Sequence, residues 1–107
     1  MPVFIPLDLL ALADGESVSF KVVRWEVGEG DIKPRDSPNL KRVRILRVWV
    51  DPADKAEGAP WWDITAQTTI ERMVPLLEGA ALEHVRFTLT MRGIPPIARH
   101  TVKVEPV

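Results

Sequence analysis

Residues 84–104 read HVRFTLTMRGIPPIARHTVKV, and this stretch decides the fold class. Apolar and polar side chains alternate on both sides of the segment Gly93-Ile94-Pro95-Pro96, which is the pattern of a β-hairpin with one face toward a core. The inward positions are Val85, Phe87, Leu89, Met91, Val102 and Val104. The outward positions are Arg86, Thr88, Thr90, Arg92, Arg99, Thr101 and Lys103. The sequence therefore predicts an antiparallel strand pair with a basic, hydroxyl-rich outer face.

Three further strands are predicted upstream of this hairpin. In chain order we expect a strand over residues 17–27, a loop over 28–39, a strand over 41–50, a loop over 51–60 and a strand over 61–66. The alternation slips at Val22-Val23, which indicates a bulge that bends the first strand. The first loop is rich in Gly, Pro and polar residues, and loops of this length tend to be functional or disordered.

A helix is predicted between the third and fourth strands. Residues 68–71, TTIE, have the form of a capping box. Apolar residues then recur at helical spacing from Ile70 to Leu77, with Met73 and Val74 between them. Pro75 lies inside this segment and is expected to kink it, and Gly79 is a plausible end.

The element order β-β-β-α-β-β predicts a mainly β protein. Residues 1–107 are expected to form one domain, because a chain of 12.0 kDa supports a single modest core. Five bent strands with one helix between strands three and four predict a small OB-like barrel. A small α+β sandwich remains the competing architecture.

The composition excludes several classes of protein. With 14 Lys+Arg against 15 Asp+Glu, the chain has a formal charge of −1, which argues against diffuse binding to polyanions. The absence of cysteine excludes disulfides, thiolate zinc sites and a cysteine nucleophile. No apolar run reaches the roughly 20 residues of a membrane span, and the N-terminal residues lack the basic region of a signal peptide. A cytoplasmic protein is expected. The 10 prolines, with one Gln and one Asn, favour a thermophilic source or reflect codon bias.

The near-zero net charge conceals a strong segregation along the chain. Residues 41–50 and 86–104 contain no acid, whereas the loops and the helix are acidic. Basic side chains that alternate with Thr on a sheet face suit a phosphate backbone, although charged residues can simply solvate such a face. The candidate phosphate-binding residues are Lys41, Arg42, Arg44, Arg47, Arg86, Arg92, Arg99 and Lys103.

Two of the four tryptophans are candidates for stacking on bases. Trp49 lies in the polar phase of its strand, and adjacent Trp61 and Trp62 must face opposite sides of theirs. We expect Trp25 and Trp62 to pack in the core. For Trp49 and Trp61, core packing and base stacking are equally compatible with the pattern.

No catalytic or metal site is predicted. Asp51, Asp54, Glu57 and Asp63 cluster in sequence, but their spacing matches no ion-binding loop. The two histidines are isolated. We therefore expect a protein that is not an enzyme and that needs no cofactor.

The chain resembles single-stranded DNA-binding proteins of the OB-fold type, as found in phages and archaea. The resemblance rests on LADGESV at 12–18, WWDIT at 61–65, the helix up to Leu77, FTLTMRG at 87–93 and RHTVKV at 99–104. It implies that bases lie across the second and third strands. They would be flanked by the loop that joins the first and second strands and by the loop that joins the fourth and fifth strands. The residues so implied are Arg42, Arg44, Arg47, Trp49, Trp61 and the loop 28–39.

The sequence thus predicts sequence-tolerant binding of single-stranded nucleic acid, either DNA or RNA, by stacking and phosphate contacts. Homodimer formation through the acidic helix or an edge strand is compatible with this prediction. The alternative is a small protein–protein interaction module of a phage, virus or defence system. In that case the basic face binds an acidic partner and the tryptophans serve as interface anchors.

Overall fold

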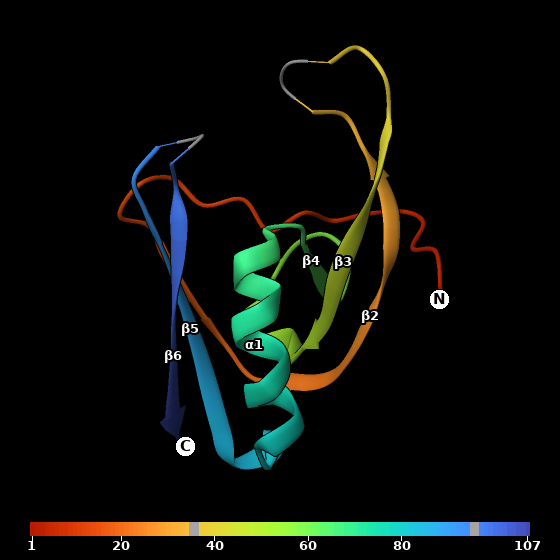
Figure 1. The fold of residues 1–107 in the computed structure, drawn as a ribbon. Helices are drawn as coiled ribbons and strands as arrows, with labels where there is room; N and C mark the ends of the chain where they lie inside the picture. The colour runs from red at the N-terminus through yellow and green to blue at the C-terminus, as the bar shows by residue number, and fades with distance from the viewer. Residues whose placement is uncertain (35–36, 95–96) are drawn as a thin grey trace.

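A computed structural model describes residues 1–34, 37–94 and 97–107. Across these residues the chain is mainly β, with two three-stranded sheets and one α-helix (Figure 1). The strands are β1 (Ser17–Phe20), β2 (Val22–Ile32), β3 (Lys41–Val50), β4 (Trp61–Ile64), β5 (Val85–Arg92) and β6 (Arg99–Pro106), and the helix is α1 (Gln67–Gly79). Short 3₁₀ turns occupy Pro52–Asp54 and Leu82–His84.

The two sheets are joined by a sharp bend in the first predicted strand. One sheet has the order β1-β5-β6 and the other β2-β3-β4, and all strand pairs are antiparallel. Only Lys21 separates β1 from β2, and the β2–β3 register shifts between Val22 and Arg24. The predicted bulge is confirmed, and it carries the chain from one sheet into the other.

The expectation of a five-stranded barrel is wrong. The bend divides the first strand in two, and within the described residues β4 does not pair with β6. The outer edge of β4 is already occupied, because the Asp63 N–H donates to the Asp8 carbonyl (2.8 Å) and the Leu10 N–H donates to the Asp63 carbonyl (3.0 Å). A four-residue strand whose outer edge is bonded elsewhere cannot close a barrel.

The segment that blocks β4 also reaches the opposite edge of the same sheet. Beside β2, the Phe4 N–H donates to the Glu29 carbonyl and the Glu29 N–H donates to the Pro2 carbonyl, both at 2.8 Å. Residues 2–10 therefore cross the outer face of the sheet β2-β3-β4 from edge to edge. We call this segment the N-terminal strap.

The strap explains why the predicted loop 28–39 is wrong in its first part. Residues 28–32 belong to β2, and the loop between β2 and β3 is shorter than expected. A Cβ at Gly28 would lie 2.6 Å from the Pro2 carbonyl oxygen, and one at Gly30 would lie 2.5 Å from Cδ1 of Ile45. These glycines mark close approach of the strap and of a neighbouring side chain to a strand, rather than a turn.

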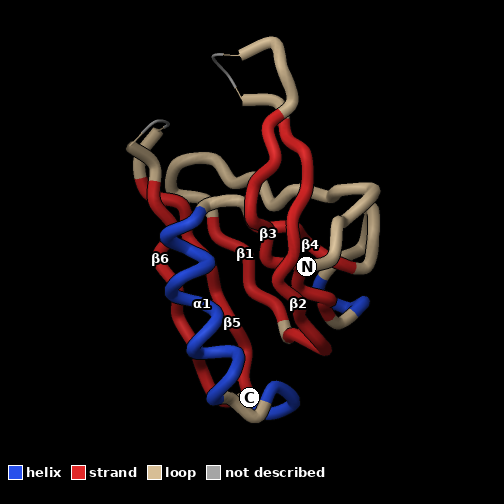
Figure 2. Tube along the Cα trace, turned by 45° about the vertical axis from the view of Figure 1, so that its right-hand side comes forward, coloured by secondary structure: helices blue, strands red, loops and turns tan. Residues whose placement is uncertain are grey.

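The core lies between the two sheets and α1. Its buried residues are Phe20, Val22, Leu46, Val48, Val50, Ile64, Ile70, Met73, Leu77, Phe87 and Leu89. The inward phase of β5 and the apolar face of α1 are confirmed. The α1 helix packs beside β6 (Figure 2) and is too short and too polar to span a membrane, as is every other helix in the described residues.

The start of α1 differs from the predicted capping box. The helix begins at Gln67 after Ala66, and its N-terminus receives no side-chain cap. Thr69 is buried and bonds through its hydroxyl to Nδ1 of His100 at 2.8 Å. Pro75 is accommodated inside the helix.

Candidate nucleic-acid interface

Three side chains form an aromatic row on the outer face of the sheet β2-β3-β4. Arg24, Trp49 and Trp61 are consecutive cross-strand neighbours. The Arg24 guanidinium lies 3.9 Å from the centre of the Trp49 ring, and the two indole rings are 6.3 Å apart at an angle of 59°. Both indoles are half-buried, so part of each ring remains accessible.

The other two tryptophans pack against the core, as predicted. Trp25 and Trp62 are both partly buried against the core cluster, and the Trp62 ring lies 5.5 Å from that of Phe20.

Arg47 lies in the next row of the same face, but it does not reach solvent. It is only 6% exposed, and it donates to Asp63 through Nε (2.7 Å) and through a terminal nitrogen (3.1 Å). Its guanidinium carbon lies 4.3 Å from the centre of the Phe4 ring and 4.1 Å from the centre of the Trp61 ring. It also donates to the Pro6 carbonyl at 2.8 Å. The expectation that Arg47 is exposed to a phosphate backbone is wrong, because a buried ion pair and the strap enclose it.

Three more of the predicted basic residues have carboxylate partners. Arg42 pairs with Asp31 (2.7 Å), Arg86 with Asp54 (2.9 Å) and Lys103 with Glu105 (3.3 Å). The hydrogen bond from Arg42 lowers the pKa of Asp31. Burial acts to raise the pKa of Asp54, but the bonds from the Lys21 amide and from Arg86 outweigh it and the pKa is lowered. Carboxylates thus neutralise part of the basic surface, and two of the three, Asp31 and Asp54, are distant in sequence from their arginine partners.

Four predicted residues remain without an ion pair in the part of the chain that the structure describes. They are Lys41, Arg44, Arg92 and Arg99. All four are exposed and lie near the loop ends of the hairpins β2–β3 and β5–β6, which project from the same end of the molecule (Figure 1). Glu29 lies across from Arg44 in the register, but it forms no ion pair with Arg44. These four side chains form the hairpin-end cluster.

The first turn of α1 lies near residues of both hairpins. The Gln67 side chain donates to the Arg44 carbonyl at 3.0 Å. Thr68 shares a hollow of about 270 Å³ with Arg99, Ala98 and Ile97. The uncapped N–H groups of this turn therefore add positive potential near the hairpin-end cluster.

The outer face of the sheet β1-β5-β6 is polar across all three strands. Ser17 and Thr90 share a hydrogen bond of 2.7 Å, and Thr88 donates to Ser19 at 3.3 Å. Arg92 and Arg99 are directly opposite each other at one end of this face. Like charges placed opposite in a sheet repel, so an anion bound between them would stabilise the pair.

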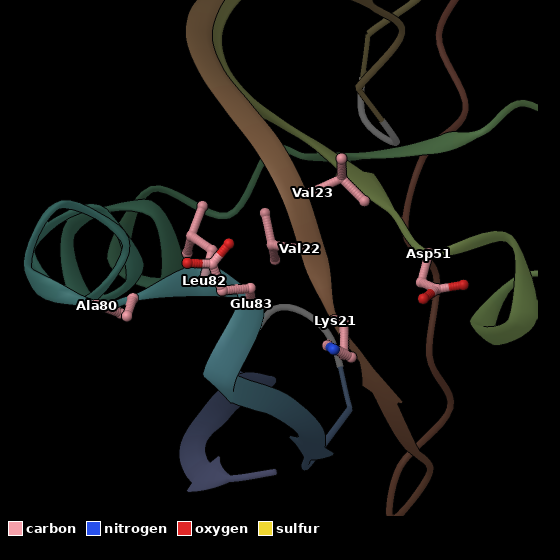
Figure 3. A pocket seen from close by; sticks show the side chains of 8 residues that line it. Lys21, Val22, Val23, Asp51, Ala80, Leu82 and Glu83 are labelled. Carbon is pink, nitrogen blue, oxygen red and sulfur yellow. The ribbon is translucent and has the colours of Figure 1, made fainter.

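Another hollow lies at the other end of β5 from the hairpin loop, near the bend at Lys21 (Figure 3). Its volume is about 560 Å³, and Val22, Val23 and Leu82 line it together with the carboxylates of Asp51 and Glu83. Two carboxylates against one lysine do not favour a polyanion there. Within the described residues, no three His, Asp or Glu side chains are grouped to hold a metal ion.

Sequence reasoning missed Arg24 and the strap. Arg24 lies on β2 next to the predicted core residue Trp25, and only the β2–β3 register places it beside Trp49. Comparison with known proteins finds no matching family model, no matching curated protein and no matching solved structure.

Proposed function

We propose that this protein binds single-stranded nucleic acid, DNA in the first instance, with little sequence preference. The observation that carries the proposal is the hairpin-end cluster. Four exposed basic side chains without carboxylate partners in the described residues gather at one end of a chain whose net charge is −1. Such a cluster suits a phosphate backbone, and arginine adds bidentate contacts that lysine cannot make.

The aromatic row supplies a place for bases. An accessible indole face stacks on any base, at about 1–3 kcal/mol per base, and so does not select sequence. Trp49, with Trp61 opposite it on β4, lies at the other end of β3 from Lys41. The strap crosses the sheet at Arg47, between Lys41 and Trp49. A strand of several nucleotides that follows β3 would pass from the hairpin end over the strap to the tryptophans.

The element order supports the proposal. If β1 and β2 are counted as one strand bent at Lys21, the order becomes β-β-β-α-β-β, which is that of an OB-type domain. We propose that the fold is an open form of that type. A role in DNA replication, repair or recombination would follow from binding of single strands.

The test is a titration of tryptophan fluorescence with oligo-dT over a range of salt concentrations. With four phosphates contacted, the log–log slope of affinity against salt should be about −3, from about −0.7 per phosphate on a single strand. Changing Arg92 and Arg99 together to Gln should bring the slope near −1.4. Lys103→Gln is the matched control, because Lys103 is exposed but already paired with Glu105.

Two results would contradict the proposal. Equal affinity for single-stranded and duplex DNA at every salt concentration would remove the strand preference. No quenching at low salt would favour the alternative, a module that binds an acidic protein.

A further inference from the structure

We call the two residues that flank the turn of the β5–β6 hairpin, Ile94 and Ile97, its tip, and both are large and apolar. Residues 94–97 read Ile-Pro-Pro-Ile, whereas hairpin turns ordinarily use Gly, Asn, Asp or Ser. Ile94 is 69% exposed and Ile97 is 76% exposed. The Ile97 N–H donates to the Ile94 carbonyl at 3.1 Å, so the two exposed isoleucines lie together and form a small apolar patch that another molecule can cover.

Two positive charges lie directly beneath this tip. Arg92 and Arg99 are cross-strand partners at the last paired position of the hairpin. One carboxylate approaches them, since Asp14 accepts from the Gly93 N–H at 2.9 Å, but among the described residues it forms no ion pair with either arginine. The tip therefore combines an apolar end with a stem that carries two cations.

The neighbouring hairpin repeats the combination. Leu40 is 68% exposed and is followed directly by Lys41 at the start of β3. Both hairpins project from the same end of the molecule (Figure 1). An occupant of this end must therefore offer an apolar surface with negative charge around it.

The end of a base-paired stack has this chemistry. Its outermost base pair exposes a flat apolar face, and phosphates of both strands flank it. Exposed Ile and Leu side chains act as wedges against bases in proteins that also contact phosphates through Arg or Lys.

We propose that the β5–β6 tip binds the terminal base pair where a duplex meets a single strand. Ile94 and Ile97 contact the base pair, and Arg92 and Arg99 contact the flanking phosphates. This inference rests on the proposed function and narrows its substrate to a junction. An anionic membrane offers a related surface, but a few aliphatic side chains give only weak anchoring there.

The experiment compares three fluorescently labelled oligonucleotides at one salt concentration. They are oligo-dT, a hairpin duplex with a single-stranded tail, and the same hairpin with a blunt end. The tailed hairpin should bind about tenfold more tightly than oligo-dT of the tail's length, from burial of the two isoleucines. A 2-aminopurine placed in the last base pair should change in fluorescence on binding.

The variant that tests the tip changes Ile94 and Ile97 together to Ser. Both side chains are exposed, so the fold should be retained, and far-UV circular dichroism checks this. The variant should lose the tenfold preference and the 2-aminopurine response, while its affinity for oligo-dT stays within twofold. Val107→Ser is the matched control, because Val107 is 69% exposed and is the C-terminal residue, at the opposite end of the molecule from both hairpin tips (Figure 1).

The outcomes separate the two proposals. If the wild-type protein binds oligo-dT but shows no preference for the tailed hairpin, the junction proposal fails and the proposed function stands. If no oligonucleotide binds, both fail. Binding to anionic vesicles that the Ser variant abolishes, without a junction preference, would overturn the inference in favour of a membrane surface.

Discussion

Replacing Asp63 by Asn should destabilise the protein strongly, because this carboxylate holds together the strap, β3 and β4. Its Oδ1 accepts from Arg47 Nε (2.7 Å). Its Oδ2 accepts from a second Arg47 nitrogen (3.1 Å), from the Asp8 N–H (2.8 Å) and from Trp61 Nε1 (3.0 Å). The carboxylate is fully buried and the Arg47 side chain is 7% exposed.

The expected loss follows from the charge that is left behind. Asn keeps the shape and one acceptor oxygen, but the Arg47 guanidinium would then be buried without a counter-ion. Removing one partner of a buried pair costs about 3–5 kcal/mol. A domain of this size loses about 4–8 °C in melting temperature per kcal/mol of stability lost, so the melting temperature should fall by about 12–40 °C. The surface variant Asp31→Asn, which breaks the exposed pair with Arg42, should melt close to the wild-type protein.

Thermal and urea unfolding, followed by circular dichroism at pH 7, measure the effect. Arg47→Met combined with Asp63→Asn should regain roughly 2 kcal/mol over Asp63→Asn alone, because no unpaired charge remains buried. A loss below about 1 kcal/mol for Asp63→Asn would refute the argument. A double variant as unstable as the sum of the single variants would refute it equally.

Three further changes test other parts of the structure. Gly28→Ala should lower the free energy of unfolding, measured in denaturant, by about 1–3 kcal/mol, because its Cβ would lie 2.6 Å from the Pro2 carbonyl oxygen of the strap. Gly79→Ala is the control and should be neutral or stabilising, because a Cβ there would have no atom within 4 Å. Burial lowers the pKa of His100 in the folded protein, so the unfolded chain binds this proton at a higher pH than the folded protein does. The melting temperature should therefore fall as the pH drops from about 6.5 to 5. His100→Gln should flatten that slope, whereas the exposed His84→Gln should leave it unchanged. The hydrogen bond from Lys55 lowers the pKa of Asp8, so its stabilising effect is present above about pH 3.8 and is lost in acid. Asp8→Asn should therefore reduce the melting temperature at pH 7 but not at pH 2.

Much of the fold could be predicted from local patterns. Alternation within residues 84–104 placed Phe87 and Leu89 in the core, and helical spacing did the same for Ile70 and Leu77. These predictions succeed because the period of a strand or helix is a property of consecutive residues. The phase slip at Val22-Val23 is equally local, and it located the bend between the sheets.

The candidate site was only half predictable. The sequence named the basic residues and the two tryptophans, but for Trp49 and Trp61 it left core packing and base stacking equally open. It could not show that Arg47 is buried against Asp63, or that Asp31 pairs with Arg42. Those partners come from other strands, so the charge that a ligand meets depends on register rather than on segment composition.

The sequence by itself determined the order of the elements, the core faces and the basic character of β3, β5 and β6. The tertiary structure alone decided that the N-terminal strap occupies the outer edge of β4, and so that the two sheets do not close into a barrel. It also decided which four of the predicted basic residues reach solvent without a carboxylate partner in the described residues. The physical reason is the same in both cases. Edge pairing and ion pairing join residues that are far apart in the chain, and no local period encodes which of them meet.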